Sequence, residues 1–167
     1  MGTGKTTLGR ALALSTGLSF CDLDQYIEQR YMKNVRTIFQ EQGEAGFRRI
    51  ESRLLREVGE FEDIVISCGG STPLFDDNMS YMNAQGTTIW LESSVDVLFR
   101  RLKVARMSRP LIAAMNDDEL QHYIQNELDR RAPFYALSSL RYSGDRLESV
   151  EQVAESVAGV RSLLGID

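Results

Sequence analysis

The chain has few of the residues that mark secreted, membrane or nucleic-acid-binding proteins. Only two cysteines, Cys21 and Cys68, occur in its 167 residues, too few for a disulfide framework, so we expect reduced thiols. No uninterrupted apolar run approaches the roughly 20 residues of a membrane-spanning helix, and the first residues lack the basic region of a signal peptide. Positive charge is scarce too, because the net charge is -5 and Lys and Arg form no run. We therefore expect a soluble, cytoplasmic protein that binds neither nucleic acid nor membrane.

Proline and histidine are also rare. The three prolines are Pro73, Pro110 and Pro133, so few helices or strands are interrupted by proline. The single histidine, His122, falls in a polar helical pattern, where we expect it to be exposed and without a role. With 43% hydrophobic residues, the chain is long enough to bury the core of a single domain over residues 1–167.

Short apolar runs alternate with amphipathic segments along the chain. Four strands are predicted, in the segments "LSFCDLD", "DIVISCGG", "TTIWLES" and "LRYSG". Helices are predicted over residues 4–15, 95–105, 117–131 and 149–164, the first of them ending at Gly17. Three further helical pieces, broken near Asn34 and Gly43, make residues 25–58 a small helical insert. The alternation predicts an α/β fold in which helices flank a parallel β-sheet.

The strongest motif is "GTGKTT", which matches the second half of the phosphate-binding pattern GxxxxGK[ST], the P-loop. Gly4 allows close approach of the backbone, Lys5 is a cation for the terminal phosphates, and Thr6 offers a hydroxyl to Mg²⁺. The plain alternative is a glycine-capped helix with an unrelated lysine. The first glycine of the pattern falls before Met1, so we expect the natural protein to carry about ten more residues there, an apolar strand and a glycine.

Two carboxylates follow the first predicted strand in "CDLD". Asp22 and Asp24 point to the same side, because side chains alternate along a strand, and they lie where α/β sheets bind ligands. Asp22 could hold the water shell of a metal, and Asp24 could orient or deprotonate an acceptor hydroxyl. The alternative use of Asp24 is to cap the helix "QYIEQRYM".

Arginines and glycines in later segments gain a role only if the fold brings them together. Arg48 and Glu51 share a helix face and would by themselves form a solvated ion pair, while "DRRAPFY" would by itself be a cationic helix end stopped by Pro133. "SCGGSTP" exposes backbone N–H groups after a buried strand. The segment 106–119, which contains "SRPLI", is a candidate lid that would carry an arginine over the phosphates.

The motifs "GTGKTTLGRALA", "DLDQYIE", "GEAGFRRIES", "VISCGGS", "RPLI" and "RRAPFY" occur in this order and together resemble the shikimate kinase family. The resemblance covers almost the whole chain. It implies a P-loop fold of the nucleoside monophosphate kinase class and transfer of the γ-phosphoryl group of ATP to the 3-hydroxyl of shikimate. It also implies Mg²⁺, with ATP and shikimate as partners; we expect a monomer.

The resemblance assigns roles to particular residues. Lys5, Asp24 and Arg109 would be catalytic, Thr6 and Asp22 would hold the metal, and Glu51 would fix the geometry of the arginines. ATP would be bound by Gly2, Thr3, Gly4, Lys5, Thr6, Thr7, Arg101 and Arg109, with Arg101 near the adenine. Shikimate would be bound by Asp24, Arg48, Gly69, Gly70 and Arg131, the two arginines holding its carboxylate bidentately.

Two departures from the family pattern and two other functions remain open at this point. Ser71 stands where the family usually has a third glycine, which is tolerated if its φ is negative, and a proline usually found near Asp145 is missing. The strand expected before Met1 would lie in the middle of the sheet, and without it the core would have a gap. The alternatives are another small-molecule P-loop kinase, of the gluconate type, and a truncated, inactive P-loop protein.

Overall fold

Four short strands with helices packed around them form the part of the chain that the structure, a computed structural model, describes: residues 2–109 and 111–166. The α/β class expected from the sequence is confirmed, and all four strands lie where they were predicted. They are β1 (Ser19–Asp22), β2 (Ile64–Ser67), β3 (Ile89–Glu92) and β4 (Leu140–Ser143).

The strands form two separate parallel pairs. β1 pairs with β2, with Asp22 opposite Ser67, and β3 pairs with β4, with Glu92 opposite Ser143. Among the described residues no strand joins one pair to the other, and the predicted sheet was expected to lack a central strand. The central strand predicted from the motif falls before residue 1 and therefore outside the described residues. Because carboxyl ends of parallel strands meet at one edge, Asp22 is brought beside the segment that follows Ser67.

The helices agree with the predicted segments in most places. They are α1 (Lys5–Thr16), α2 (Leu23–Tyr31), α3 (Val35–Gly59), α4 (Asn78–Gln85), α5 (Val95–Val104), α6 (Asp117–Tyr135) and α7 (Val150–Leu164), with short 3₁₀ helices η1 (Thr72–Leu74) and η2 (Arg106–Ser108). The insert has the three predicted pieces, because Asn34 caps α3 and Gly43, at φ 68°, kinks it. α4, η1 and η2 were not predicted.

The prediction that Pro133 stops a helix is wrong. α6 continues to Tyr135, and the N–H of Ala136 still donates to the carbonyl of Ala132, at 2.8 Å. Proline lacks an N–H for the ladder and its ring crowds the carbonyl four residues earlier, but the N–H groups after it can still close the last turn of the helix. The helix therefore carries its last residues one turn further into the site.

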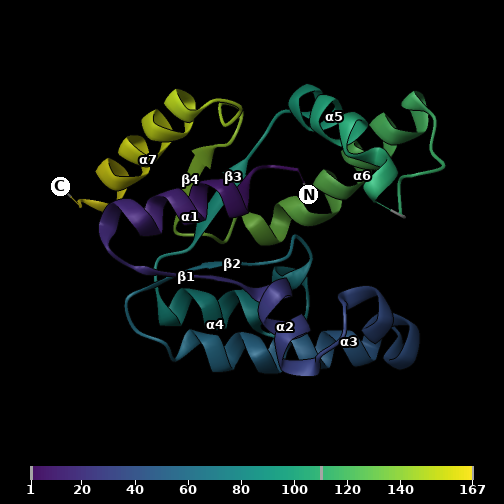
Figure 1. Cartoon of the computed structure of the whole chain (residues 1–167), viewed down its shortest axis with the longest axis horizontal. Coiled ribbons are helices and arrows are strands. Elements are labelled where there is room, and N and C mark those ends of the chain that lie inside the picture. Colours follow the sequence, from purple (N-terminus) through teal and green to yellow (C-terminus); the bar gives the residue numbers. More distant parts are fainter. Residues whose placement is uncertain (1, 110, 167) are drawn as a thin grey trace.

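α1 connects the two halves of the molecule. Figure 1 shows β1 and β2 with α2, α3 and α4 in one half, and β3 and β4 with α5, α6 and α7 in the other. Gly9 of α1 lies against β1, because a Cβ atom there would stand 2.8 Å from the ring of Phe20. Leu8 and Leu12 of the same helix pack with Val157 and Val160 of α7. The amino end of α1 is thereby fixed between the two strand pairs.

Two further apolar clusters hold each half together. In one half, residues of α2 and α3 form a buried cluster: Leu23, Ile27, Ile38, Phe47, Leu54, Leu55 and Val58. In the other, residues of α5, α6 and the segment between them do so: Leu98, Leu102, Ile112, Leu120 and Ile124. Burial of such side chains contributes about 1.5–3 kcal/mol each. The site described next lies where these two packed halves face each other.

Candidate active site

A cleft of about 580 Å³ opens at the carboxyl ends of β1 and β2 and the amino end of α1. Every site residue predicted from the sequence lines it except Thr3, Arg48 and Glu51. The lining residues are Gly2, Gly4, Lys5, Thr6, Thr7, Asp22, Asp24, Ser67, Cys68, Gly69, Gly70, Ser71, Arg101, Leu102, Arg109 and Arg131. The fold thus brings together motifs that are more than a hundred positions apart in the sequence.

The P-loop segment has the backbone that phosphate binding requires. Gly2 and Gly4 adopt positive φ angles of 76° and 92°, which strain any residue with a side chain. A Cβ atom on Gly4 would also stand 2.6 Å from Cδ1 of Leu147. Lys5, Thr6 and Thr7 follow as the first turn of α1, whose free N–H groups and dipole favour an anion.

Lys5 is not the unrelated lysine of the plain alternative. Burial lowers its pKa, while the nearby charges of Asp24, Cys68 and Asp22 act to raise it. These groups come from the ends of β1 and β2, so the lysine points into the cleft among them. Partly desolvated ammonium groups interact more strongly with a phosphate than exposed ones do.

Asp22 and Asp24 have different surroundings. Asp22 accepts a hydrogen bond from Thr6 Oγ1 on Oδ2, at 2.9 Å, and one from the N–H of Gln25 on Oδ1, at 3.3 Å. The helix-capping role that the sequence suggested for Asp24 therefore belongs to Asp22. Asp24 is left facing the cleft. Burial raises its pKa to about 6, helped by the charges of Asp22 and Glu51, while Lys5 acts in the opposite direction.

Arg48 and Glu51 form a buried ion pair, so the interpretation of this pair as solvated is wrong. Arg48 Nη1 donates to Glu51 Oε2 at 2.9 Å, and the Glu51 side chain is only 1% exposed. The guanidinium of Arg48 also lies over the ring of Phe75, the residue that follows η1, with 4.3 Å between Cζ and the ring centroid. It lies near the rings of Phe39 and Phe47 as well. Aromatic faces attract the cation and fix its plane.

Arg131 reaches the cleft from α6 and approaches the glycine turn after β2. It is paired with Glu127, one turn earlier on its own helix. A Cβ atom on Gly70 would stand 2.6 Å from Arg131 Nη1, so the two are in close contact. Ser71 has a φ of -100°, so the backbone condition for a residue with a side chain at this position is met.

Two residues at this turn were missed by the sequence analysis. Tyr135 donates its hydroxyl to the carbonyl oxygen of Gly70 at 2.5 Å, and Thr72 donates to Glu51 Oε1 at 2.8 Å. Tyr135 stands four positions after Arg131 and thus on the same helix face, a signal that would have identified it. No local pattern distinguishes Thr72 from any other threonine in a loop.

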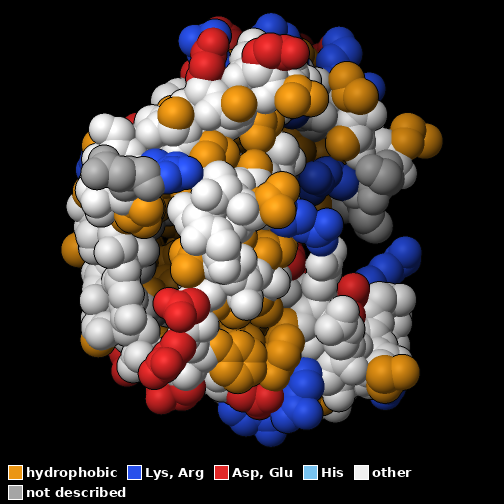
Figure 2. Space-filling model, turned by 60° about the vertical axis from the view of Figure 1, so that its left-hand side comes forward, with side chains coloured by type: hydrophobic (Ala, Val, Ile, Leu, Met, Phe, Trp, Pro, Cys, Tyr) orange, Lys and Arg blue, Asp and Glu red, His pale blue; other side chains and the backbone are white. Residues whose placement is uncertain are grey.

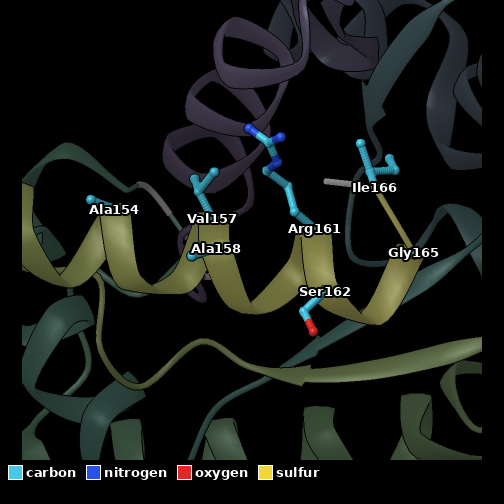
Figure 3. A pocket seen from close by; sticks show the side chains of 7 residues that line it. All are labelled: Ala154, Val157, Ala158, Arg161, Ser162, Gly165 and Ile166. Atoms are coloured by element: carbon cyan, nitrogen blue, oxygen red, sulfur yellow. The ribbon is translucent and has the colours of Figure 1, made fainter.

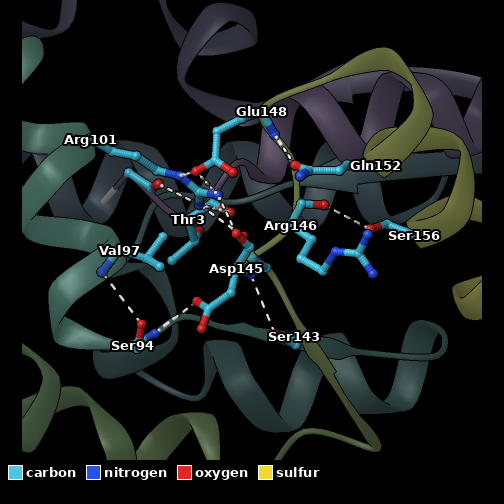
Figure 4. Close-up of polar contacts among 12 residues, drawn as sticks. Thr3, Ser94, Val97, Arg101, Ser143, Asp145, Arg146, Glu148, Gln152 and Ser156 are labelled. Carbon is cyan, nitrogen blue, oxygen red and sulfur yellow. Dashed lines mark hydrogen bonds and ion pairs between the residues drawn. The ribbon is translucent and has the colours of Figure 1, made fainter.

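Arg101 holds the P-loop from the other side of the cleft. Its Nη1 lies 3.3 Å from the carbonyl oxygen of Gly2, 3.4 Å from that of Thr3 and 2.8 Å from that of Gly144. Nη2 donates to the carbonyl of Asp145 at 3.1 Å, and Nε to Glu148, as Figure 4 shows. The proximity to adenine expected for Arg101 stays a prediction, while its observed contacts join the P-loop to the loop after β4.

The predicted lid segment, residues 106–119, is anchored by Ile112 and by the ion pairs that Lys103 and Arg106 form with Asp117. Arg109 lines the cleft, and three residues later Ile112 is fully buried against α5 and α6. Pro110, which belongs to the predicted lid motif, lies outside the described residues. The segment between the two helices is therefore tied to the core beside Arg109, which lines the cleft.

Other parts of the molecule offer less chemistry. His122 is exposed, as predicted, and both cysteines are free. A second hollow runs along α7 (Figure 3), where Arg161 is the one charged side chain among the lining residues. On the face in Figure 2, Lys and Arg side chains gather around a hollow at the right, although the net charge is -5. None of the described helices is long and apolar enough to cross a bilayer.

The chain is similar in sequence to known proteins over almost its whole length. The family described as shikimate kinase matches residues 1–160. A shikimate kinase of Bacteroides fragilis is 51% identical over 99% of this chain and 93% of its own length, and one of Phocaeicola vulgatus is 49% identical over 98% and 94%.

Solved structures agree with these sequence matches. A shikimate kinase crystal structure from Bacteroides thetaiotaomicron has a TM-score of 0.96, with 48% identity over 99% of this chain and 94% of that one. A shikimate kinase from Acinetobacter baumannii, solved in complex with shikimate, has a TM-score of 0.83, with 26% identity over 99% and 89%.

Proposed function

Because this chain belongs to the shikimate kinase family, we propose that the cleft between its two halves is where ATP and shikimate meet. The protein is an ATP-dependent kinase that transfers the γ-phosphoryl group to the 3-hydroxyl of shikimate, a step in aromatic amino acid biosynthesis. The observation that carries the placement is the cleft itself, which unites the P-loop, the two aspartates and the glycine turn.

The nucleotide phosphates bind the P-loop, residues 2–7, at the amino end of α1. Free N–H groups of this turn and the ammonium of Lys5 face the same side, and both stabilise the negative charge that the transferred group carries. Arg109 approaches from the predicted lid segment and adds a cation there. Arg101 supports the nucleotide site through the P-loop carbonyls that it binds.

Thr6 and Asp22 suit Mg²⁺. Their oxygens are 2.9 Å apart at the edge of the cleft, and Mg²⁺ prefers oxygen ligands while keeping several of its waters. An ion shared with phosphates needs only one or two protein oxygens, because the phosphates and its own waters supply the other ligands. Bound Mg²⁺ would neutralise phosphate charge.

Asp24 acts as the base towards the acceptor hydroxyl. It faces the cleft near Lys5, and with a pKa of about 6 it is ionised at neutral pH yet close enough to that pH to accept a proton. When the hydroxyl oxygen attacks the γ-phosphorus, its proton passes to the Asp24 carboxylate and ADP leaves. Lys5 stabilises the charge on the transferred group.

Arg48 and Arg131 bind the carboxylate of shikimate. Their Nε atoms are two of the three side-chain polar atoms in the described chain that are buried without a hydrogen-bond partner. A buried N–H without an acceptor is costly, and a carboxylate ligand would satisfy it with a charge-assisted bond. Gly69 and Gly70 lie between the arginine-bearing helices α3 and α6 and present backbone to the same ligand.

The remaining features are proposals of the same kind. Residues 25–58 serve as the substrate-binding insert, and residues 106–119 serve as a lid over the phosphates. The protein works as a monomer in the cytoplasm.

An assay of ADP release with ATP, Mg²⁺ and shikimate tests the proposal. The native chain should release ADP only when shikimate is present. Arg131→Ala should raise the KM for shikimate about tenfold or more, because a charge-assisted pair is lost. Arg130→Ala is the matched control, since Arg130 is the neighbouring, exposed arginine that is paired with the same glutamate.

Three results would count against the proposal. Equal KM values in the two variants would remove Arg131 from the substrate site. ADP release with gluconate in place of shikimate would favour the other small-molecule kinase. A folded chain without any acceptor-dependent release would favour the inactive P-loop protein.

A further inference from the structure

Glu51 depends on Thr72 for half of its hydrogen bonding. The carboxylate is 1% exposed, so water does not satisfy its oxygens. Oε2 accepts from Arg48 Nη1 at 2.9 Å, and Oε1 accepts from Thr72 Oγ1 at 2.8 Å. A buried carboxylate needs a donor on each oxygen, because an unsatisfied one keeps the full cost of desolvation. The threonine hydroxyl therefore takes the place of water at Glu51.

Thr72 is itself held tightly. It is fully buried, its N–H donates to the carbonyl of Gly69 at 3.1 Å, and its carbonyl accepts from Asn78 Nδ2 at 2.9 Å. The same Asn78 nitrogen donates to Ser52 on α3. These bonds fix the hydroxyl relative to α3, the helix that carries both Arg48 and Glu51. Its position is thus set by the fold and not by a flexible side chain.

The hydroxyl also lies directly beneath the glycine turn. A Cβ atom on Gly69 would stand 3.1 Å from Thr72 Oγ1 and 3.4 Å from Glu51 Oε1. The threonine therefore contacts the turn on one side and the carboxylate on the other. Movement of the glycine turn or of the carboxylate would therefore disturb the hydrogen bond between Thr72 and Glu51.

We propose that Thr72 is a positioning residue for the substrate's carboxylate, whose hydroxyl fixes Glu51 and thereby the guanidinium of Arg48. The inference rests on the proposed role of Arg48 in binding shikimate. Without the hydroxyl, Oε1 of Glu51 loses its hydrogen-bond donor, and the carboxylate turns towards water and releases Arg48 Nη1. Phe75 still covers the guanidinium, so the arginine stays near the site but loses its fixed orientation.

Thr72→Val tests this inference, because valine keeps the branched shape and removes only the hydroxyl. We expect the KM for shikimate to rise about tenfold, since a hydrogen bond to a charged group is lost, while the KM for ATP stays unchanged. Thr72→Ser restores the hydroxyl and should bring the KM back to the native value. Thr16→Val is the matched control, because it removes a partly buried hydroxyl at the far end of α1.

A double-mutant cycle shows whether Thr72 acts through Arg48. In an Arg48→Ala background, Thr72→Val should change the KM for shikimate by less than twofold, because there is no guanidinium left to orient. Fully additive effects would overturn the inference, as would equal losses in Thr72→Ser and Thr72→Val. If Thr72→Val does not fold, Thr72→Ala removes the same hydroxyl without adding bulk, and the same outcomes apply.

The inference and the proposed function fail in different ways. A native chain without shikimate-dependent ADP release contradicts the proposed function. Native turnover together with an unchanged KM for shikimate in Thr72→Val contradicts only the role of Thr72. A parallel rise in the KM for ATP would indicate general damage to the cleft and would also overturn the inference.

Discussion

Gly70 and Arg131 are in such close contact that a Cβ atom on the glycine would stand 2.6 Å from Nη1 of the arginine. The φ angle of Gly70 is not positive, so the glycine is required for space and not for an unusual backbone conformation. The hydroxyl of Tyr135 holds the carbonyl of the same residue from α6. The glycine turn and the arginine therefore share one fixed geometry.

Gly70→Ala should weaken shikimate binding. The added methyl group displaces the guanidinium from its place, so we expect the KM for shikimate to rise about tenfold or more while the KM for ATP stays unchanged. Steady-state kinetics with each substrate varied in turn measures both values. Gly86→Ala is the control, because nothing lies within 4 Å of a Cβ atom there. An unchanged KM for shikimate would show that Arg131 binds shikimate equally well when its guanidinium is displaced from its present place beside Gly70.

Turnover should depend on the ionisation of Asp24. Its pKa of about 6 predicts that kcat falls as the pH drops through about 6, because the protonated carboxyl cannot accept the hydroxyl proton. Asp24→Asn should abolish turnover and spare ATP binding. The pH profile of kcat and binding of an ATP analogue measured by calorimetry test the two statements. Loss of both turnover and ATP binding in Asp24→Asn would contradict a role on the acceptor side.

The same pKa shift predicts that the Asp24 carboxyl makes the folded chain less stable as the pH rises, whereas kcat rises with pH. A carboxyl whose pKa is raised by folding stabilises the folded state in its protonated form, and this contribution is lost as the pH rises through the folded-state pKa. Asp24→Asn carries no charge, so its Tm should exceed that of the native chain at about pH 8, with a smaller difference at about pH 5. Thermal unfolding at both pH values measures the difference. A lower Tm for the variant at the higher pH would contradict the assignment.

Asp22→Asn should raise the requirement for Mg²⁺ without unfolding the chain. An asparagine oxygen can still accept from the N–H of Gln25 and cap α2, but the negative charge beside Thr6 is lost. We expect the Mg²⁺ concentration for half-maximal activity to rise about tenfold with an unchanged Tm. Asp96→Asn, in the exposed first turn of α5, is the control. The same Mg²⁺ dependence in both variants would place the ion elsewhere.

Arg101→Lys should affect the nucleotide side alone. Lysine keeps the positive charge but lacks the planar guanidinium that donates to the carbonyls of Thr3, Gly144 and Asp145 at the same time. The KM for ATP should rise roughly tenfold, and the KM for shikimate should stay unchanged. Arg100→Lys, the exposed neighbour on α5, provides the comparison. Equal kinetics in both variants would mean that the P-loop keeps its shape without these bonds.

Much of the fold follows from local signals. All four strands were predicted from apolar runs, and the insert breaks at Asn34 and Gly43 as expected, because a capping side chain and a glycine of positive φ act within a few residues. α4 was missed because its segment, "NMSYMNAQ", has no marked amphipathic pattern. Its first residue, Asn78, is instead buried by contacts with α3 and η1.

The chemistry of the site can be predicted from the amino-acid sequence: a phosphate loop, two carboxylates after a strand, a glycine turn and arginines at family spacing. The pairing of these groups depends on the tertiary fold. It made the ion pair of Arg48 and Glu51 a buried one, gave the helix cap to Asp22 and joined Arg101 to the P-loop. Capping and periodicity act over one or two turns, whereas hydrogen bonds and burial in the fold join residues that are 99 positions apart, as Arg101 and Gly2 are, or further apart, as Leu8 and Val160 are.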